Sequence, residues 1–385
     1  MSLYDKLINS KKNTTEAFRD FFSEHTIKNE FLSLATLELT PLCNFKCAFC
    51  YARLSPDELK ARGVEIKRFD AWKRYIDEFA EMGCLELSLT GGECTLHPDF
   101  CEIYDYAYSK GFMMSVFTNG SNITDEIFEL FKSKPPFRIY ITIYGNSPQV
   151  YEKVTGNAKY HDIVKANIEK LMDSKLDVIL QGTFCIDNVQ DTEPLFDYAF
   201  SLKTEFRYSN RLLTYGNCTP EVKNKLAAAN SLIEQASRNI WYKKQGLTPP
   251  DELSDSNIEK RIIPQTDNKD CGIKCNGGKN TCFIRHDGMM APCNTFDAFL
   301  VDTNDKPIKL CFKEITEMVN SMPRIMECEG CIHARHCVSC AAAHYNDTGK
   351  LGVPSPQLCF KILEPEKAKE EREFYEKHGY LKVDC

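Results

Sequence analysis

The sequence predicts an α/β protein with an open or partial barrel, followed by a cysteine-rich domain. Between residues 31 and 215, six apolar, strand-like segments alternate with amphipathic helical patterns. Such alternation indicates a parallel sheet, and six units suffice for an open or partial barrel. Cysteines then gather between residues 266 and 365, where periodicity is weak. At 385 residues the chain is also too long for one ordinary domain.

The predicted elements follow one another along the chain. Residues 1–30 form an N-terminal helical cap. The barrel occupies residues 31–218, with strands predicted at 31–39, 84–90, 113–118, 138–144, 177–186 and 206–215 and helices at 69–82, 99–109, 124–133, 160–174 and 192–202. Thr124 is the predicted N-cap of its helix. A helical connector and linker (219–265), the cysteine-rich domain (266–365) and a helical C-terminal tail (366–385) complete the chain.

Composition excludes several classes of function. The net charge of −7 argues against a nucleic-acid or membrane-surface partner, which would favour a basic patch. The first 13 residues lack the apolar core of a signal peptide, and no apolar run reaches transmembrane length. We therefore expect a cytoplasmic protein. In that reducing compartment, 19 cysteines indicate metal or redox chemistry and not a disulfide framework.

Three cysteines stand directly after the first predicted strand. Cys43, Cys47 and Cys50 have the spacing C-x3-C-x2-C, and we call residues 43–50 the cysteine loop. An ordinary 4Fe–4S site uses four cysteines, so a loop with three leaves one iron open to an outside ligand. A zinc site is the alternative, although zinc loops usually combine two cysteine pairs.

This motif resembles the signature of the radical SAM superfamily, with Phe49 in the aromatic position. The resemblance implies a partial (β/α)6 TIM barrel whose active site lies at the C-terminal ends of the strands. It also implies that S-adenosylmethionine chelates the open iron. A donor such as flavodoxin or ferredoxin would reduce the cluster. An electron from the cluster would then cleave S-adenosylmethionine to methionine and a 5′-deoxyadenosyl radical.

A second motif, Gly91-Gly92-Glu93, ends the second predicted strand. Glycines there allow close backbone approach to a ligand, and a neighbouring carboxylate can accept from an ammonium group. A plain strand-to-helix turn is the alternative. In the family that the chain resembles, this motif binds the amino group of the methionine moiety. The resemblance further implies ribose or carboxylate contacts for Asn119 and Thr142 and adenine contacts for Phe49 and Tyr51.

The later cysteines resemble the SPASM domain over about the last third of the chain. Gly288 and Cys293 fit its G-x4-C element, and a C-x2-C-x5-C-x2-C run follows, with x2 where the domain usually has x3. The resemblance implies two auxiliary 4Fe–4S clusters, making three in all. One would use Cys275, Cys282, Cys293 and Cys340, and the other Cys328, Cys331, Cys337 and Cys359. Cys271 could replace Cys282, and a pair of zinc ribbons is the alternative.

Radical SAM enzymes with SPASM domains mostly act on peptide or protein side chains. We therefore expect hydrogen abstraction from a side chain or α-carbon of a ribosomal peptide or protein, giving a cross-link, an oxidation or an epimerisation. A dehydrogenase or epimerase of a small molecule such as an aminosugar is the alternative, and a non-catalytic zinc protein a remote one. The barrel begins at about residue 31, so we expect either that a separate protein recognises the leader peptide or that the barrel itself binds the substrate.

The sequence does not name a catalytic acid or base. Sulfatase maturases carry an aspartate base directly after the G-x4-C cysteine, whereas this chain has Asn294 there. Because an amide cannot act as a base, formylglycine formation is a less favoured interpretation of this chain. Asp297 is near enough in sequence to substitute.

Overall fold

The computed structural model of this chain describes residues 23–209, 212–227, 275–328, 340–356 and 358–359, with a few positions between 236 and 246. Two compact units form. The first combines Met1–Ile233 with Asn276–Asn320, and the second combines Glu234–Cys275 with Ser321–Cys385. Most of the predicted N-terminal cap, most of the connector and the whole C-terminal tail lie outside the described residues.

The first unit is built around one nine-stranded sheet in the order β6-β5-β4-β3-β2-β1-β7-β8-β9. Its strands are β1 (Leu34–Glu38), β2 (Glu86–Thr90), β3 (Met113–Thr118), β4 (Arg138–Thr142), β5 (Val178–Thr183), β6 (Phe206–Ser209), β7 (Thr281–Ile284), β8 (Met289–Ala291) and β9 (Val301–Asp302). All pairings from β6 through β1 to β7 are parallel. The six predicted parallel strands and the partial-barrel fold class are thereby confirmed.

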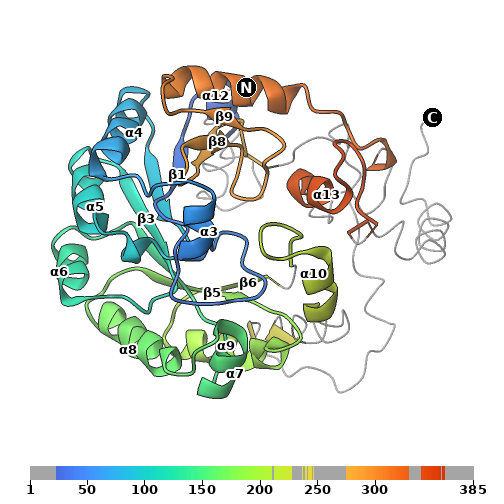
Figure 1. Cartoon of the computed structure of the whole chain (residues 1–385). Coiled ribbons are helices and arrows are strands. Elements are labelled where there is room, and N and C mark those ends of the chain that lie inside the picture. The colour runs from blue at the N-terminus through green and yellow to red at the C-terminus, as the bar shows by residue number, and fades with distance from the viewer. Residues whose placement is uncertain are drawn as a thin grey trace. The chain divides into compact units, whose positions relative to one another are not determined.

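Helices cover the outside of this sheet and also stand at one of its ends (Figure 1). They are α3 (Pro56–Ala61), α4 (Phe69–Glu81), α5 (Phe100–Ser109), α6 (Asp125–Ser133), α7 (Pro148–Thr155), α8 (Tyr160–Asp173), α9 (Thr192–Ser201), α10 (Pro220–Leu226) and α12 (Ile308–Asn320), with short 3-10 turns η1 (Cys94–Leu96) and η2 (Val189–Asp191). Helix α4 buries Trp72, Tyr75, Ile76 and Phe79, the spacing of an amphipathic stripe. Thr124 caps α6 as predicted.

The two faces of the sheet differ in polarity because side chains alternate along each strand. One set of paired positions is apolar and buried beneath the helices; it includes Leu37, Leu89, Val116, Ile141 and Leu180. The opposite set faces the interior of the barrel and is largely polar; it includes Glu38, Thr90, Thr142, Gln181 and Arg285. A polar interior at the strand ends provides the groups that a ligand site needs.

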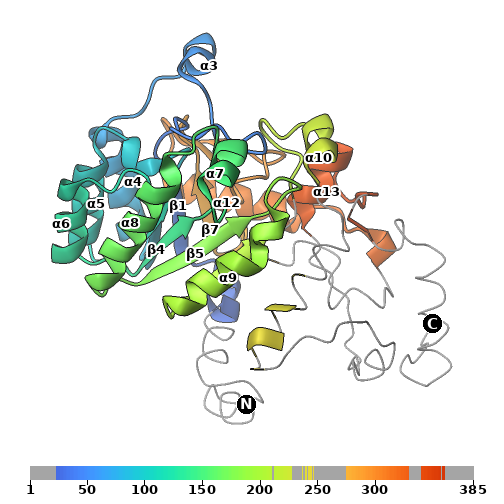
Figure 2. The same cartoon turned by 90° about the horizontal axis from the view of Figure 1, so that it is seen from below.

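Residues 276–320 belong with the barrel and not with the remaining cysteine-rich residues. Strand β7 extends the barrel sheet by pairing in parallel with β1, from Leu34↔Thr281 to Leu37↔Ile284. The structure thus divides the chain differently from the predicted boundary at residue 266. The reason is that β7 has only 4 residues and lies among cysteines and glycines, so the sequence does not reveal it as a strand of the barrel sheet. Figure 2 shows α7 and α10 on the upper side of the sheet in that view, with α3 standing apart above them.

In its described part, the second unit contains η4 (Met326–Cys328) and α13 (Ala341–Thr348). Gly349 ends α13 in the left-handed conformation, at φ 68°. The buried imidazole of His344 accepts a hydrogen bond from the Ser355 backbone N–H at 2.9 Å. His344 thereby fastens α13 to the following loop. No described helix in either unit is long and apolar enough to cross a membrane.

Candidate active site

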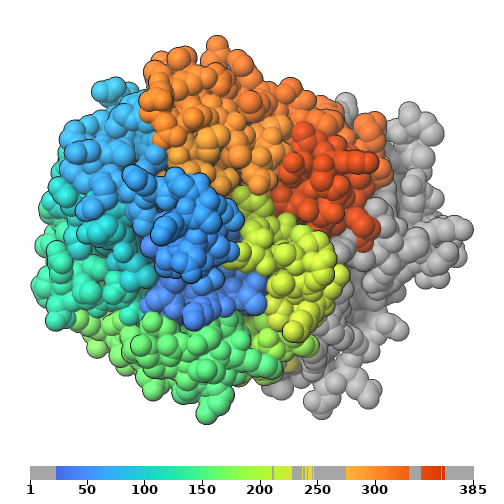
Figure 3. Space-filling model, in the orientation of Figure 1, coloured from blue at the N-terminus to red at the C-terminus, as the bar shows by residue number. Residues whose placement is uncertain are grey.

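The thiols of the cysteine loop are surrounded by hydrogen-bond donors. Cys43 Sγ accepts from the Phe45 backbone N–H at 3.4 Å and from Asn119 Nδ2 at 3.6 Å. Cys50 Sγ accepts from the Arg53 backbone N–H at 3.3 Å. Donors aimed at sulfur stabilise thiolate, and thiolate is the form that binds iron. In Figure 3, residues from this loop to α3 lie on the middle of the viewed face of the first unit.

Burial opposes the same thiolates. The pKa of Cys43 is raised to about 12, chiefly by burial and also by the negative charges of Glu93 and Cys50. Burial also raises the pKa of Cys47, which receives a hydrogen bond from the Tyr144 phenol. Three neighbouring thiolates, of which Cys47 is buried and the other two are half-buried, repel one another and need positive charge among them, which iron would supply. The donor set therefore fits a cluster held by three cysteines.

Glu93 joins the ends of two strands. Its buried carboxylate accepts from Thr95 Oγ1 at 2.6 Å and from Thr118 Oγ1 at 2.7 Å. It also accepts from the backbone N–H groups of Thr95 at 3.1 Å and Asn119 at 2.6 Å. The carboxylate is thus bonded to protein groups on both oxygens, and its predicted contact with a methionine ammonium stays a prediction.

Gly91 and Gly92 are required by the protein's own backbone. A Cβ on Gly91 would lie 2.5 Å from the carbonyl oxygen of Thr40, and one on Gly92 would lie 2.6 Å from those of Pro41 and Leu42. The sequence predicted close approach to a ligand here. That approach stays a prediction, and the close approach that the structure shows is to the segment that leads into the cysteine loop. These glycines seat that loop on the end of β2.

The other predicted cofactor contacts lie around the loop in different settings. Asn119 Nδ2 donates to Asn44 Oδ1 at 2.9 Å, which ties the end of β3 to the cysteine loop. Phe49 packs towards Tyr144, with ring centroids 6.5 Å apart. Thr142 is the last residue of β4 and is half-buried in the barrel interior. Sequence reasoning missed Tyr144, whose position just after β4 was its available signal.

A cavity of about 200 Å³ opens beside the cysteine loop. Its wall comes from β1, β7 and the loops after Cys50, before α10 and after β8; it includes Glu38, Tyr51, Arg53, Arg62, Tyr215, Asn217, Phe283, Arg285, His286, Asn294 and Asp297. Asn294 Nδ2 donates to the Tyr51 phenol at 2.7 Å. Tyr51, predicted to lie near an adenine, is thereby placed in this wall, and so is Asp297.

The electrostatics of the wall connect the cavity to two predicted cluster sites. The pKa of Tyr215 is raised to about 12, chiefly by burial and also by the negative charges of Asp297, Glu38 and Cys293. Burial is also the largest cause of the raised pKa of Tyr51, and both Cys50 and Cys293 raise this pKa further. The cavity therefore lies within electrostatic reach of the cysteine loop on one side and of Cys293 on the other.

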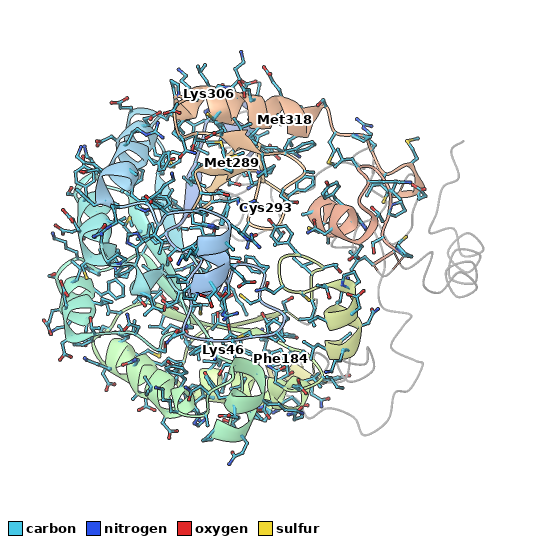
Figure 4. All side chains as sticks on the ribbon, viewed as in Figure 1. Lys46, Phe184, Met289, Cys293, Lys306 and Met318 are labelled. Carbon is cyan, nitrogen blue, oxygen red and sulfur yellow. The ribbon has the colours of Figure 1, made fainter. Side chains whose placement is uncertain are left out.

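The predicted auxiliary ligands do not all come together. Cys282 is a buried residue of β7 on the face towards the helices, where Cys84 and Cys311 of α12 are its electrostatic neighbours. In Figure 4, Cys293 lies nearer to the middle of the first unit than α12 does. Strand β7 thus turns the Cys282 side chain towards the helices, and the expected grouping of Cys282 with Cys293 at one cluster stays a prediction.

The remaining auxiliary cysteines belong to the second unit. Of these, the described ones are Cys275, Cys328, Cys340 and Cys359. Cys271, Cys331 and Cys337 lie outside the described residues. Cys340, where the spacing departs from the usual SPASM pattern, is half-buried and immediately precedes α13. Its role as a cluster ligand stays a prediction.

We expect Cys282→Ala to leave the iron and sulfide content of the anaerobically purified protein unchanged, because this thiol packs as a small apolar group in the core. Cys293→Ala is the matched comparison and should lose the irons of one auxiliary cluster. Chemical iron analysis of both variants checks this. Loss of iron in Cys282→Ala alone would restore the ligand assignment made from the sequence.

Comparison with known proteins decides the family. The family model described as "Radical SAM superfamily" matches residues 37–199, which run from the end of β1 into α9 and include the cysteine loop. Residues 37–199 belong to the radical SAM superfamily. The protein is a radical SAM enzyme, and the chemistry of its donor set agrees with that assignment.

Curated relatives of this radical SAM enzyme are distant. The subtilosin biosynthesis protein AlbA of Bacillus subtilis is 38% identical over 141 residues, which cover 35% of this chain and only 30% of AlbA. The sporulation killing factor maturation protein SkfB of the same organism is 23% identical over 329 residues, 85% of this chain and 71% of SkfB. An AdoMet-dependent heme synthase of Methanosarcina barkeri is 24% identical over 344 residues, which cover 85% of this chain and 96% of the heme synthase.

Solved structures share the fold. Streptococcus suis SuiB bound to S-adenosylmethionine superimposes with a TM-score of 0.63 at 14% identity, covering 91% of this chain and 83% of SuiB. The protein anSMEcpe, solved with AdoMet and the Cp18Cys peptide, superimposes with a TM-score of 0.60 at 17% identity, covering 89% of this chain and 99% of anSMEcpe. Because these matches extend over most of the chain, they include part of the cysteine-rich region as well as the barrel.

Proposed function

We propose that this radical SAM enzyme abstracts a hydrogen atom from a side chain or α-carbon of a ribosomal peptide or protein. Bound S-adenosylmethionine would supply the 5′-deoxyadenosyl radical at the cluster of Cys43, Cys47 and Cys50. A cross-link, an oxidation or an epimerisation would follow. Two auxiliary 4Fe–4S clusters in the cysteine-rich region, as the SPASM resemblance implies, would accept the second electron of an oxidation.

The observation that carries this proposal is the position of the cavity. The cavity wall contains Arg53, whose backbone N–H donates a hydrogen bond to Cys50 Sγ. It also contains Tyr51, whose phenol pKa is raised by the charge of Cys293. A substrate held there would lie between the radical-generating site and one auxiliary site. The fold shared with SuiB and anSMEcpe supports a peptide as the substrate, since structures of both with peptides are known.

The test measures 5′-deoxyadenosine formation by anaerobically reconstituted protein after reduction, with and without pools of synthetic peptides. We expect one pool to stimulate formation and one of its peptides to change in mass spectra by the loss of two hydrogens or by deuterium uptake from heavy water. Flavodoxin and dithionite should both serve as electron donors. A protein that forms no 5′-deoxyadenosine under any condition would contradict the proposal.

A small-molecule substrate is the second candidate, and the AdoMet-dependent heme synthase favours it. That relative matches this chain over 85% of its length and is itself covered to 96%. Adding tetrapyrroles to the same assay separates the two candidates. Stimulation by a tetrapyrrole and by no peptide would replace the peptide proposal, and no separate leader-recognition protein would then be needed.

A further inference from the structure

A buried carboxylate–histidine pair lies in the wall of the cavity. Glu38 ends β1, and His286 follows β7, the neighbouring strand. His286 Nδ1 lies 2.6 Å from Glu38 Oε2, and the His286 backbone N–H donates to the same oxygen at 3.1 Å. The two side chains are only 8% and 7% exposed. Two bonds to one oxygen fix the imidazole ring relative to the sheet.

The pair leaves the second ring nitrogen available. An ionised carboxylate only accepts hydrogen bonds, so the proton of a neutral His286 ring lies on Nδ1 and Nε2 carries a lone pair. Within the described parts of the chain no protein group bonds to Nε2, and the ring forms part of the cavity wall. This is the arrangement in which a carboxylate orients a histidine for proton transfer.

We infer that His286 is the general base of this enzyme and that Glu38 is its positioning residue. The inference rests on the proposed function, since the substrate is the group placed in the cavity. The step moves one proton: the substrate's X–H bond breaks, an N–H bond forms at Nε2, and the electron pair stays on X. X is the oxygen, nitrogen or sulfur that forms a new bond or double bond once a neighbouring C–H hydrogen has been removed.

The charges around the pair suit this step. The carboxylate of Glu38 balances the imidazolium that forms. Arg53 and Arg285 also face the cavity, and Arg285 is held by Asp287 at 3.2 Å. These cations favour an anionic X over its protonated form, whereas the phenols in the wall can donate to it.

Two other polar side chains of the wall are weaker candidates for the base. Asn294 is an amide and already donates to Tyr51, so it can orient but cannot accept the proton. Asp297 is exposed, so water competes for its oxygens. His286 is the cavity-lining side chain with both a fixed orientation and an available lone pair.

The chain contains a matched control. His161 is also buried, and its Nδ1 lies 2.7 Å from Asp162 Oδ1. Its Nε2, however, is buried without a hydrogen-bond partner among the described residues, and His161 is not part of the wall of this cavity. The two histidines therefore share the carboxylate contact and differ in access to the ring nitrogen.

A first experiment needs no substrate. Reconstituted protein is treated with diethyl pyrocarbonate between pH 6 and 8, and ethoxyformylation of each histidine is followed by peptide mass spectrometry. We expect His286 to react at least tenfold faster than His161. Equal, slow modification of both would overturn the inference, since Nε2 would then not be an available base.

A second experiment uses the peptide or tetrapyrrole that stimulates 5′-deoxyadenosine formation. His286→Gln should retain substrate-dependent 5′-deoxyadenosine within about threefold, while product falls about 10²–10⁴-fold and the acidic limb of the product pH profile disappears. Glu38→Gln should lower product less and shift that limb, and His161→Gln should leave it unchanged. Iron content and thermal unfolding of each variant establish that it is folded.

The outcomes separate this inference from the proposed function. Unchanged product from His286→Gln, or an equal loss of 5′-deoxyadenosine and product, overturns the general-base role. The general-base role is also overturned if Asp297→Asn loses product while His286→Gln keeps it. An epimerised product overturns it as well, because epimerisation needs a hydrogen donor and no proton acceptor. If no substrate stimulates the wild-type protein, the proposed function fails, and the modification rates still report on the pair.

Discussion

Replacing Cys43, Cys47 and Cys50 together with alanine will abolish reductive cleavage of S-adenosylmethionine. These thiols provide all the protein ligands of the predicted radical-generating cluster. We expect about twelve irons in the parent protein and about eight in the variant, because one four-iron cluster is lost and two remain. Iron and sulfide analysis of anaerobically purified protein, with chromatographic detection of 5′-deoxyadenosine, measures both effects.

Cys101→Ala is the control for this experiment. Cys101 is a half-buried residue of α5, one of the helices outside the sheet, so its loss should leave iron content and cleavage unchanged. If the triple variant kept its full iron content, the cysteine loop would not be a cluster site. Zinc in place of iron in both proteins would support the remote alternative of a metal-stabilised scaffold.

Gly92→Ala will displace the cysteine loop without touching a cysteine. The added Cβ would lie 2.6 Å from the carbonyl oxygens of Pro41 and Leu42, and backbone atoms cannot rotate away as a side chain can. The Glu93 backbone N–H also donates to Leu42 O at 2.8 Å, which holds the two segments together. We expect the free energy of unfolding to fall by about 1–3 kcal/mol, with loss of iron from the first site.

Urea unfolding and iron analysis test this expectation, with Gly63→Ala as the control. A Cβ added to Gly63 would meet no described atom within 4 Å, and the φ of Gly63 is 64°, so alanine there meets only the left-handed backbone cost of about 1–2 kcal/mol. Its iron content should be that of the wild type. A Gly92→Ala protein with full iron and unchanged stability would show that the loop tolerates the shift.

The sequence predicted the parallel strands because each of them carries its own signal. Strands β1 to β5 are apolar on the face beneath the helices, and helix patterns separate them. The predicted strand at 206–215 was too long, since β6 ends at Ser209. Strand β7 could not be predicted, because four residues carry little periodicity and its partner is β1, far away in the sequence.

The site was predictable where spacing determines chemistry and not where folding brings distant residues together. The cysteine loop is local, so its three thiols could be identified without a structure. Glu38 gave a weak signal, a carboxylate between Leu37 and Leu39 at the end of an apolar strand. His286 gave none, since its partner is 248 positions away. Cys282 was assigned from a family pattern without knowledge of the strand face that it occupies, and its role as a ligand stays a prediction.

The pairing of β7 with β1 has a consequence for the order of assembly during synthesis. Until residues 281–284 have left the ribosome, one edge of β1 has no partner strand, although the other edge can already pair with β2. The Glu38–His286 contact forms only after that, because His286 is made later still. A nascent chain can thus complete its cysteine loop long before its cavity wall, and iron delivered early would meet a barrel with an exposed edge.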